Sequence, residues 1–218
     1  MKVWLGEQVH AAQVETDVVM LDVVSDAYFC LVGARDHLRL GPGRQVEASP
    51  PQAADDLIAA GLLTAQLLTG AASSAFERSA PAVTRGLEGE TKTVTPRAFF
   101  DAAVANLRAA KAMAELPFSA VLDLAGPLAP SAFDPPDARL LAEAGRFDRL
   151  SPWLPRAGLC LMRSLQQRLY LQRRGHHAAW VFGVRTWPFE AHCWLQAGTV
   201  VLDDHVDHAA GFTPILVV

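Results

Sequence analysis

The final third of the chain changes from a helical to a strand-like hydrophobic pattern. Leu161, Leu165 and Leu169 recur at helical spacing, and Gly175 follows them, which predicts a helix over residues 156–174. Short runs of apolar, β-branched and aromatic residues come next, and they predict strands at 178–185, 190–196 and 199–204, with a fourth candidate at 214–218. Turn signals separate these runs, so we expect one helix followed by an antiparallel meander.

The first sixty residues show the opposite order, with strands before helices. Strand-like runs lie within residues 11–31, most clearly at 18–21 and 27–31, and helical stretches follow at 34–40 and 51–60. Three strands followed by three short helices are typical of a small winged-helix-like module.

A change in composition separates these two regions. Residues 65–95 are rich in Ala, Ser, Thr, Gly and charged side chains, which favours a linker or a weakly ordered connection. Amphipathic helices are predicted beyond it at 96–116 and 136–147, and both are expected to pack on the sheet. The apolar face of the first helix comprises Phe99, Phe100, Ala103, Val104, Leu107 and Ala110. The predicted fold class is α+β, with an N-terminal domain at 1–80, a linker at 81–95 and a C-terminal domain at 96–218.

Three residues of the C-terminal domain suggest chemistry. Cys160, His192 and Asp204 follow one another in the order nucleophile, base and base-orienting carboxylate. Transfer of the thiol proton to imidazole makes a reactive thiolate, and a carboxylate on the other ring nitrogen holds the correct tautomer. Cys160 falls in the first turn of its predicted helix, where the helix dipole favours a thiolate. Each residue alone is more often structural, but the three in this order indicate a papain-type cysteine hydrolase centre.

The identity of the carboxylate depends on the length of one hairpin loop. A three-residue loop at 197–199 places Asp204 opposite His192. A two-residue loop places Asp203 there instead, because a shift of one residue exchanges the two faces of a strand. We favour Asp204.

The neighbours of His192 are assigned by strand alternation. Trp194 shares its face and is a candidate for lining a substrate groove, whereas Cys193 points the other way and is expected to be structural. The His205-x-x-His208 pair matches no common zinc spacing, and in a meander such side chains lie apart, so no metal site is predicted.

Four motifs surround these residues. They are Cys160-Leu161-Met162-Arg163-Ser164-Leu165 with Arg173-Arg174-Gly175, the strand at 181–185, the segment at 188–194 and the ending at 211–216. Together they resemble the lasso peptide biosynthesis B proteins, which are transglutaminase-like leader peptidases, across roughly residues 95–218. The triad of that family is a cysteine, a histidine and an aspartate twelve residues beyond the histidine. The resemblance therefore implies Cys160, His192 and Asp204.

The N-terminal region extends this resemblance. The segments at 25–29 and 57–63 look like the precursor-recognition domain of peptide-modification enzymes, related to the quinone-biosynthesis chaperone type. In such a domain an extended leader peptide can add as a strand to an exposed sheet edge. The expected leader-binding residues are Tyr28, Phe29, Cys30 and Leu31 on the strand, and Asp55, Leu57 and Ile58 on the helix.

The resemblance also implies partners. The substrate is expected to be a ribosomally made precursor peptide, and the partner an asparagine-synthetase-like lasso cyclase. Processing in that family can require ATP, although the sequence shows no G-x-x-x-x-G-K-[ST] loop and no other recognisable cofactor motif. The alternative functions are an amide-forming acyltransferase with the same triad and a non-catalytic chaperone that presents the precursor.

Charge and cysteine content narrow the function further. The net charge is −4, and residues 1–64 contain no Lys/Arg cluster, which argues against nucleic-acid binding by the winged-helix-like module. Three scattered cysteines suggest reduced thiols rather than a disulfide framework. Because no signal sequence or long apolar run is found, we expect a soluble cytoplasmic protein without a membrane partner.

Overall fold

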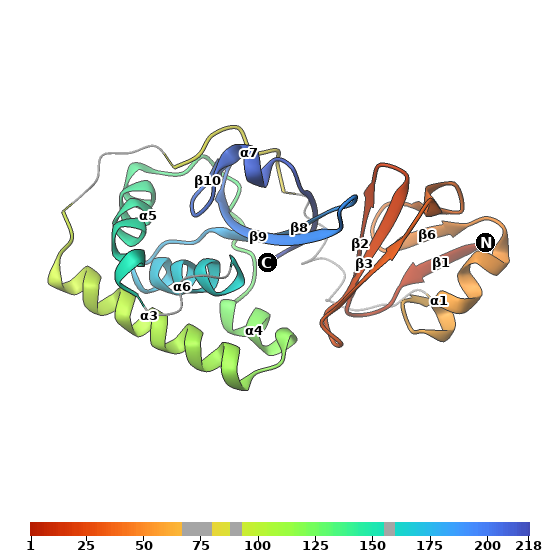
Figure 1. Ribbon diagram of the computed structural model, residues 1–218, viewed down its shortest axis with the longest axis horizontal. Helices are drawn as coiled ribbons and strands as arrows, with labels where there is room; N and C mark the ends of the chain where they lie inside the picture. The colour runs from red at the N-terminus through yellow and green to blue at the C-terminus, as the bar shows by residue number, and fades with distance from the viewer. Residues whose placement is uncertain (67–79, 88–92, 155–159) are drawn as a thin grey trace. The chain divides into compact units, whose positions relative to one another are not determined.

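The computed structural model describes residues 1–66, 80–87, 93–154 and 160–218 (Figure 1). The chain divides into two compact units. The first comprises residues 1–79 together with 183–191 and 213–216, and the second comprises 80–182, 192–212 and 217–218.

Residues 1–66 form two antiparallel sheets. One has the strand order β5-β6-β1-β7, formed by Leu38–Leu40, Gln45–Ala48, Lys2–Leu5 and Leu63–Thr64. The other has the order β2-β3-β4, formed by Val9–Val14, Asp17–Asp22 and Ala27–Leu31. A 3₁₀ turn at Pro51–Ala54 leads into helix α1, Asp55–Ala59. Apolar residues of both sheets, among them Val3, Val18, Met20 and Val46, form one buried core.

The structure corrects the predicted order of elements in this unit. The expected strands at 18–21 and 27–31 lie in β3 and β4, and the helical stretch at 51–60 contains α1. The helix predicted at 34–40 is wrong, since only Ala34–Asp36 forms a 3₁₀ turn and β5 follows it. Leu38 is buried while Arg39 is exposed, the period-two pattern of a strand. The described residues thus form two small sheets with one short helix, rather than three strands followed by three helices.

The longer helices of the described part of the second unit are α3 (Pro96–Glu115), α4 (Phe118–Ala125), α5 (Ala138–Leu150) and α6 (Cys160–Arg173). The side chains of Thr95 and Asp137 cap α3 and α5 by accepting the backbone N–H groups of Ala98 and Leu140. Helix α3 packs along α6 (Figure 1). Asp101 of α3 forms ion pairs with Arg173 and Arg174.

The helix predicted at 96–116 is found, but its buried face differs from the expected one. Phe99, Phe100 and Leu107 are 52%, 62% and 67% exposed. The buried side is instead a stripe of small residues, comprising Ala98, Ala102, Ala105, Ala109 and Ala112. Alanines let two helix backbones approach closely. The alanines of α3 therefore lie in the contact with α6, and the large side chains lie on the opposite side.

A third sheet among the described residues has the order β10-β9-β8-β11, formed by Val200–Val201, Glu190–Ala197, Ala179–Arg185 and Thr213–Val217. All four predicted runs contain a strand, and a short helix, α7 (Val206–Ala209), lies before β11. The hairpin loop is shorter than expected: Val200 pairs with Ala197, which leaves Gly198 and Thr199 as a two-residue loop. Gly198 has a φ of +56°, a conformation that favours glycine.

Part of the segment predicted as a linker runs along this hairpin. The backbone N–H of Thr84 donates to the carbonyl of Thr199, and Arg85 forms a β-bridge with Val200. The side chain of Gln196 donates to the carbonyl of Pro81. Residues 80–87 are therefore part of the second unit.

Among the described residues, no helix combines the length and the apolar character that crossing a membrane requires.

Candidate active site

Cys160 is the first described residue of α6, and the stripe that it shares with Ser164 and Gln167 faces the sheet. The hydroxyl of Ser164 donates to Asp203 and to the carbonyl of Cys193, 3.4 Å away. The side-chain amide of Gln167 donates to the carbonyl of Leu202. These bonds fix the start of α6 over β9, while Leu165 and Leu169 on another face are buried in the core. Residues 155–159, which the sequence places just before Cys160, lie outside the described residues.

The thiol of Cys160 lies in an environment that stabilises its anion. Hydrogen bonds from the Cys193 thiol and the His192 ring lower the pKa of Cys160 to about 4, and the Cys193 backbone N–H and the charge of His192 act in the same direction against burial. Half-burial combined with several donors is typical of a reactive cysteine.

Cys193 departs from the expectation that it points away from the site. Its thiol hydrogen-bonds to Cys160, and this bond together with burial raises the pKa of Cys193 well above the ordinary value. The expectation was wrong because the Cys160 sulfur lies against the backbone of β9 and accepts the backbone N–H of Cys193. At this position the side chains of both His192 and Cys193 can reach the sulfur.

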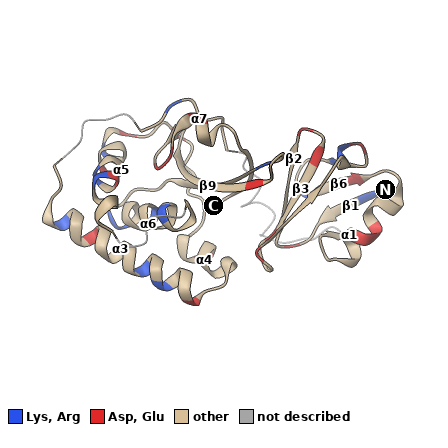
Figure 2. Cartoon of the chain, in the orientation of Figure 1, with Lys and Arg blue, Asp and Glu red and all other residues tan. Residues whose placement is uncertain are grey.

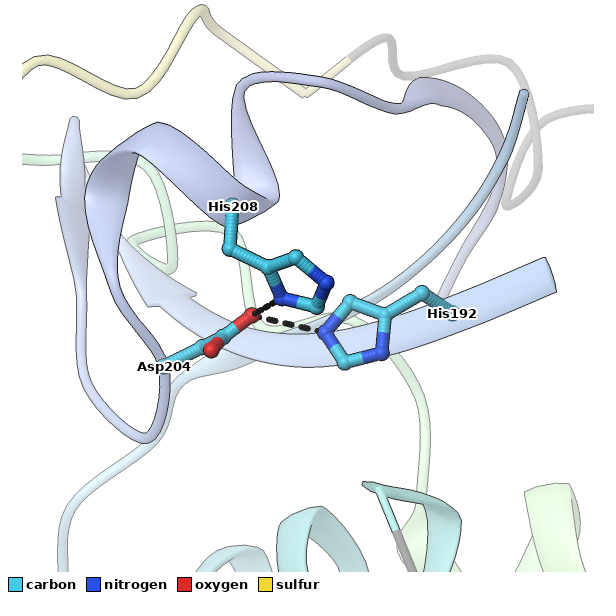
Figure 3. Close-up of side chains that lie close together, drawn as sticks. All are labelled: His192, Asp204 and His208. Atoms are coloured by element: carbon cyan, nitrogen blue, oxygen red, sulfur yellow. Dashed lines mark hydrogen bonds and ion pairs between the residues drawn. The ribbon is translucent and has the colours of Figure 1, made fainter. Parts of the chain in front are cut away.

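His192 connects the thiol to a carboxylate. Its Nε2 is 2.7 Å from Oδ2 of Asp204, as Figure 3 shows, which leaves Nδ1 for the bond to Cys160. Burial alone lowers the pKa of His192, but the hydrogen bonds to Cys160 and Asp204 outweigh it, and the pKa is raised. The indole of buried Trp194 stacks on the ring, with 6.0 Å between centroids. The geometry therefore favours a thiolate–imidazolium pair.

Asp204 reaches His192 from outside the strand ladder. The backbone N–H of Leu202 still donates to the carbonyl of Leu195, but the next acceptor is a side chain: Oδ1 of Asp203 takes the backbone N–H of Leu195 at 2.7 Å. Strand β10 therefore ends, and the chain bends so that Asp204 faces His192. The loop Gly198-Thr199 has two residues, but its register differs from the one that would place Asp203 opposite His192. Continued from the Ala197–Val200 pair, it would place His205 there, yet Asp204 contacts the histidine.

Asp203 has a different environment. It is buried, and although Ser164 and the Leu195 backbone donate to it, burial raises the pKa of Asp203 to about 6. Its two oxygens join α6 to β9, which is a structural connection.

The sequence reasoning missed His208, which lies on α7. Its Nδ1 is 2.7 Å from the same Asp204 oxygen that contacts His192 (Figure 3). The His205-x-x-His208 pattern was the available signal, but the expectation that these side chains lie apart from His192 was wrong for His208. The ligand atoms of His192, Asp204 and His208 lie within 4.8 Å of one another, a set that a metal ion could use.

The expected leader-binding residues lie on β4 and α1 of the first unit. Strand β4 is an edge strand, on which Phe29 is 38% exposed and Tyr28, Cys30 and Leu31 are half-buried. On α1, Leu57 and Ile58 pack against the core together with Leu31, and Asp55 is exposed.

Residues 103–217 match the transglutaminase-like superfamily. This range covers more than half of the chain and includes Cys160, His192 and Asp204, so the chain belongs to the transglutaminase-like superfamily. No curated protein and no solved structure matches the chain significantly.

Proposed function

We propose that this chain is a cysteine leader peptidase of lasso peptide biosynthesis, which binds the leader of a ribosomal precursor and cleaves it from the core peptide. The observation that supports it best is the contact chain from Cys160 through His192 to Asp204 in a domain of the transglutaminase-like superfamily. The lasso assignment rests on the motifs around these residues.

The proposed mechanism gives each of the three residues a separate role. The Cys160 thiolate attacks the carbonyl carbon at the leader–core junction, and backbone N–H groups at the start of α6 are candidate donors to the oxyanion. Protonated His192 gives its proton to the leaving amine, which releases the core peptide and forms an acyl-enzyme. Water, deprotonated by His192, then hydrolyses the thioester and frees the leader. Asp204 orients the ring and stabilises its cationic form in both steps.

Leader capture is assigned to the first unit. The edge strand β4 offers backbone groups for one more strand, and the exposed Phe29 ring offers an apolar contact. Tyr28, Cys30 and Leu31 on β4 and Asp55, Leu57 and Ile58 on α1 complete the proposed groove. Acidic residues outnumber basic ones in this unit and the basic ones are dispersed (Figure 2), which favours a peptide over a nucleic acid.

The released core peptide is the substrate that macrolactam formation requires. A lasso cyclase is therefore the proposed partner, and any ATP requirement of the processing reaction is assigned to that partner rather than to this chain.

Incubation with a synthetic precursor peptide, followed by mass spectrometry, tests the proposal. We expect cleavage at one bond, release of the leader peptide with a free C-terminal carboxylate, and loss of cleavage in Cys160→Ala. A second reaction includes an excess of a primary amine. Capture of the leader as an amide would support the acyltransferase instead, and leader binding without any covalent change would support a presenting chaperone.

A further inference from the structure

We propose that His208 is a positioning residue that holds the Asp204 carboxylate against His192. The inference rests on the cysteine-hydrolase function proposed above. Figure 3 shows the arrangement: His192 Nε2 and His208 Nδ1 both contact the same oxygen of Asp204, each at 2.7 Å.

Asp204 needs such support because the sheet does not hold it. Strand β10 ends at Val201, so no described ladder hydrogen bond fixes the backbone of Asp204. The start of α7 compensates: the backbone N–H of His205 donates to Oδ1 at 2.8 Å, and His208 donates to Oδ2. One donor on each oxygen prevents the carboxylate from rotating away from His192.

The His208 ring is itself held in place. Backbone bonds from Ala209 to the carbonyl of His205 and from Ala210 to that of Val206 close the turn that carries it. The buried Phe212 ring lies 5.3 Å from the His208 ring and 5.1 Å from the His192 ring, measured between centroids. One aromatic side chain therefore contacts both histidines.

The chemistry of the contact is donor to acceptor. An ionised carboxylate only accepts, so the nitrogen of His208 that faces it carries hydrogen. The electrostatics agree: burial alone raises the pKa of Asp204, but hydrogen bonds from His208, the His205 backbone and His192 lower it overall. Both rings point at the oxygen itself at hydrogen-bond distance, and a metal bound by the same three groups would withdraw Asp204 from His192.

Alkylation of Cys160 tests the proposal without any peptide substrate. The rate with iodoacetamide is measured at pH 5.5 and pH 10, and the modified site is identified by peptide mass mapping. At pH 5.5 the thiolate exists as the partner of protonated His192, whereas at pH 10 thiols ionise without that help. In His208→Ala we expect the rate at pH 5.5 to fall about fourfold and the rate at pH 10 to stay within about twofold, since losing a hydrogen bond to a charged group corresponds to about two pKa units and moves the pKa of Cys160 from about 4 toward 6.

Two further variants separate positioning from folding. His208→Asn keeps an N–H donor close to the position of Nδ1 and is expected to recover most of the lost rate at pH 5.5. Val206→Ala shortens a neutral side chain on the same short helix and is expected to behave like the wild type. With a precursor peptide, His208→Ala is expected to lower kcat and to leave KM within about twofold.

Several outcomes would overturn the proposal. An unchanged or faster rate at pH 5.5 in His208→Ala would mean that His208 competes with His192 for Asp204. Equal loss at both pH values, without recovery in His208→Asn, would indicate only a folding role. Loss of wild-type reactivity in EDTA would indicate a metal site.

One result separates the two proposals. If Cys160 is alkylated rapidly at pH 5.5 in the wild type but not in His208→Ala, and no precursor is cleaved, the leader-peptidase proposal fails and the role of His208 stands.

Discussion

The carboxylate of Asp203 accepts the backbone N–H of Leu195 at 2.7 Å. It occupies the place that a backbone carbonyl would take if strand β10 continued, so the ladder stops there. The next residue, Asp204, is thereby directed to His192. Two adjacent aspartates thus have separate tasks: one ends the strand and joins it to α6, and the other contacts the candidate base.

The nucleophile is tested by replacing the two thiols of the candidate site, Cys160 and Cys193, in turn. Cys160→Ala is expected to abolish precursor cleavage, with a loss of at least about 10⁴-fold, and to leave leader binding intact, because the proposed groove lies on β4 and α1. His192→Ala is expected to match it, since members of a triad act as a unit. Cleavage is followed by mass spectrometry and leader binding by calorimetry.

Cys193→Ala is the matched control for the nucleophile. It removes a hydrogen bond to Cys160, so the variant is expected to lose activity mainly at low pH, where that bond helps to keep the thiolate. A complete loss at every pH in correctly folded Cys193→Ala, with activity remaining in Cys160→Ala, would move the nucleophile to Cys193.

The pH profile follows from the thiolate–imidazolium pair. The pKa of Cys160 is lowered to about 4 and that of His192 is raised, so the pair is populated from about pH 4 to above the ordinary imidazole range. We expect kcat/KM to rise through an acidic limb near pH 4 and to fall on an alkaline limb above about 6.5. Both limbs are properties of the coupled pair. A profile that rises only near the pKa of a free thiol would show that the pair does not form.

Leader binding is tested at the exposed ring of β4. Phe29→Ala is expected to weaken leader binding about tenfold without lowering the melting temperature, because an exposed ring adds little to the core but can anchor a peptide. Phe100→Ala removes an even more exposed ring, 62% against 38% for Phe29, from α3 of the second unit and serves as the control. Fluorescence anisotropy of a labelled leader measures both. Equal affinity in Phe29→Ala and the wild type would place the groove elsewhere.

Local patterns in the sequence predicted elements better than they predicted packing. The helix at Cys160 and the strands around His192 follow from hydrophobic period and turn residues. The buried face of α3 did not, because close contact with α6 favours alanines over the larger Phe99 and Phe100. The strand at Leu38–Leu40 was also missed, since three residues give too short a pattern to distinguish from a helix.

The same limit applies to the site. Asp204 lies twelve residues beyond His192, and this aspartate, which the resemblance to a family implies, is the one that contacts the histidine. The supporting argument from a three-residue loop was wrong, because Val200 pairs with Ala197 and the loop has two residues. Asp204 still reaches His192, because the side chain of Asp203 enters the ladder and ends it before residue 204. Strand periodicity carries no information about a side chain that replaces a backbone acceptor in the ladder. Strand periodicity also could not predict that His208, which lies on a helix beyond the strand, contacts Asp204.

Asp203 also makes stability depend on pH. Its pKa is about 6 in the folded chain, above the value of about 3.9 in an unfolded one, so the folded state binds the proton more tightly. This contribution to stability is fully present below about pH 4 and is lost as the pH rises through 6. Asp203→Asn resembles the protonated form at every pH. The free energy of unfolding of the variant relative to wild type is therefore expected to increase by about 2–3 kcal/mol between pH 4 and pH 7. Urea denaturation measures it, and a constant difference would show that Asp203 is not protonated on folding.

The two aspartates should differ most clearly in catalysis. In Asp204→Asn the amide can donate to His192 and stabilise the wrong ring tautomer, so we expect a loss in kcat of up to about 10⁴-fold and an alkaline limb at lower pH. In Asp203→Asn the amide oxygen can still accept the Leu195 N–H, and the ladder still ends, so the loss is expected to stay within about tenfold. Kinetics on both variants, with circular dichroism to establish that each is folded, decide the question. If Asp203→Asn lost more activity than Asp204→Asn, the residue that orients His192 during the reaction would be Asp203.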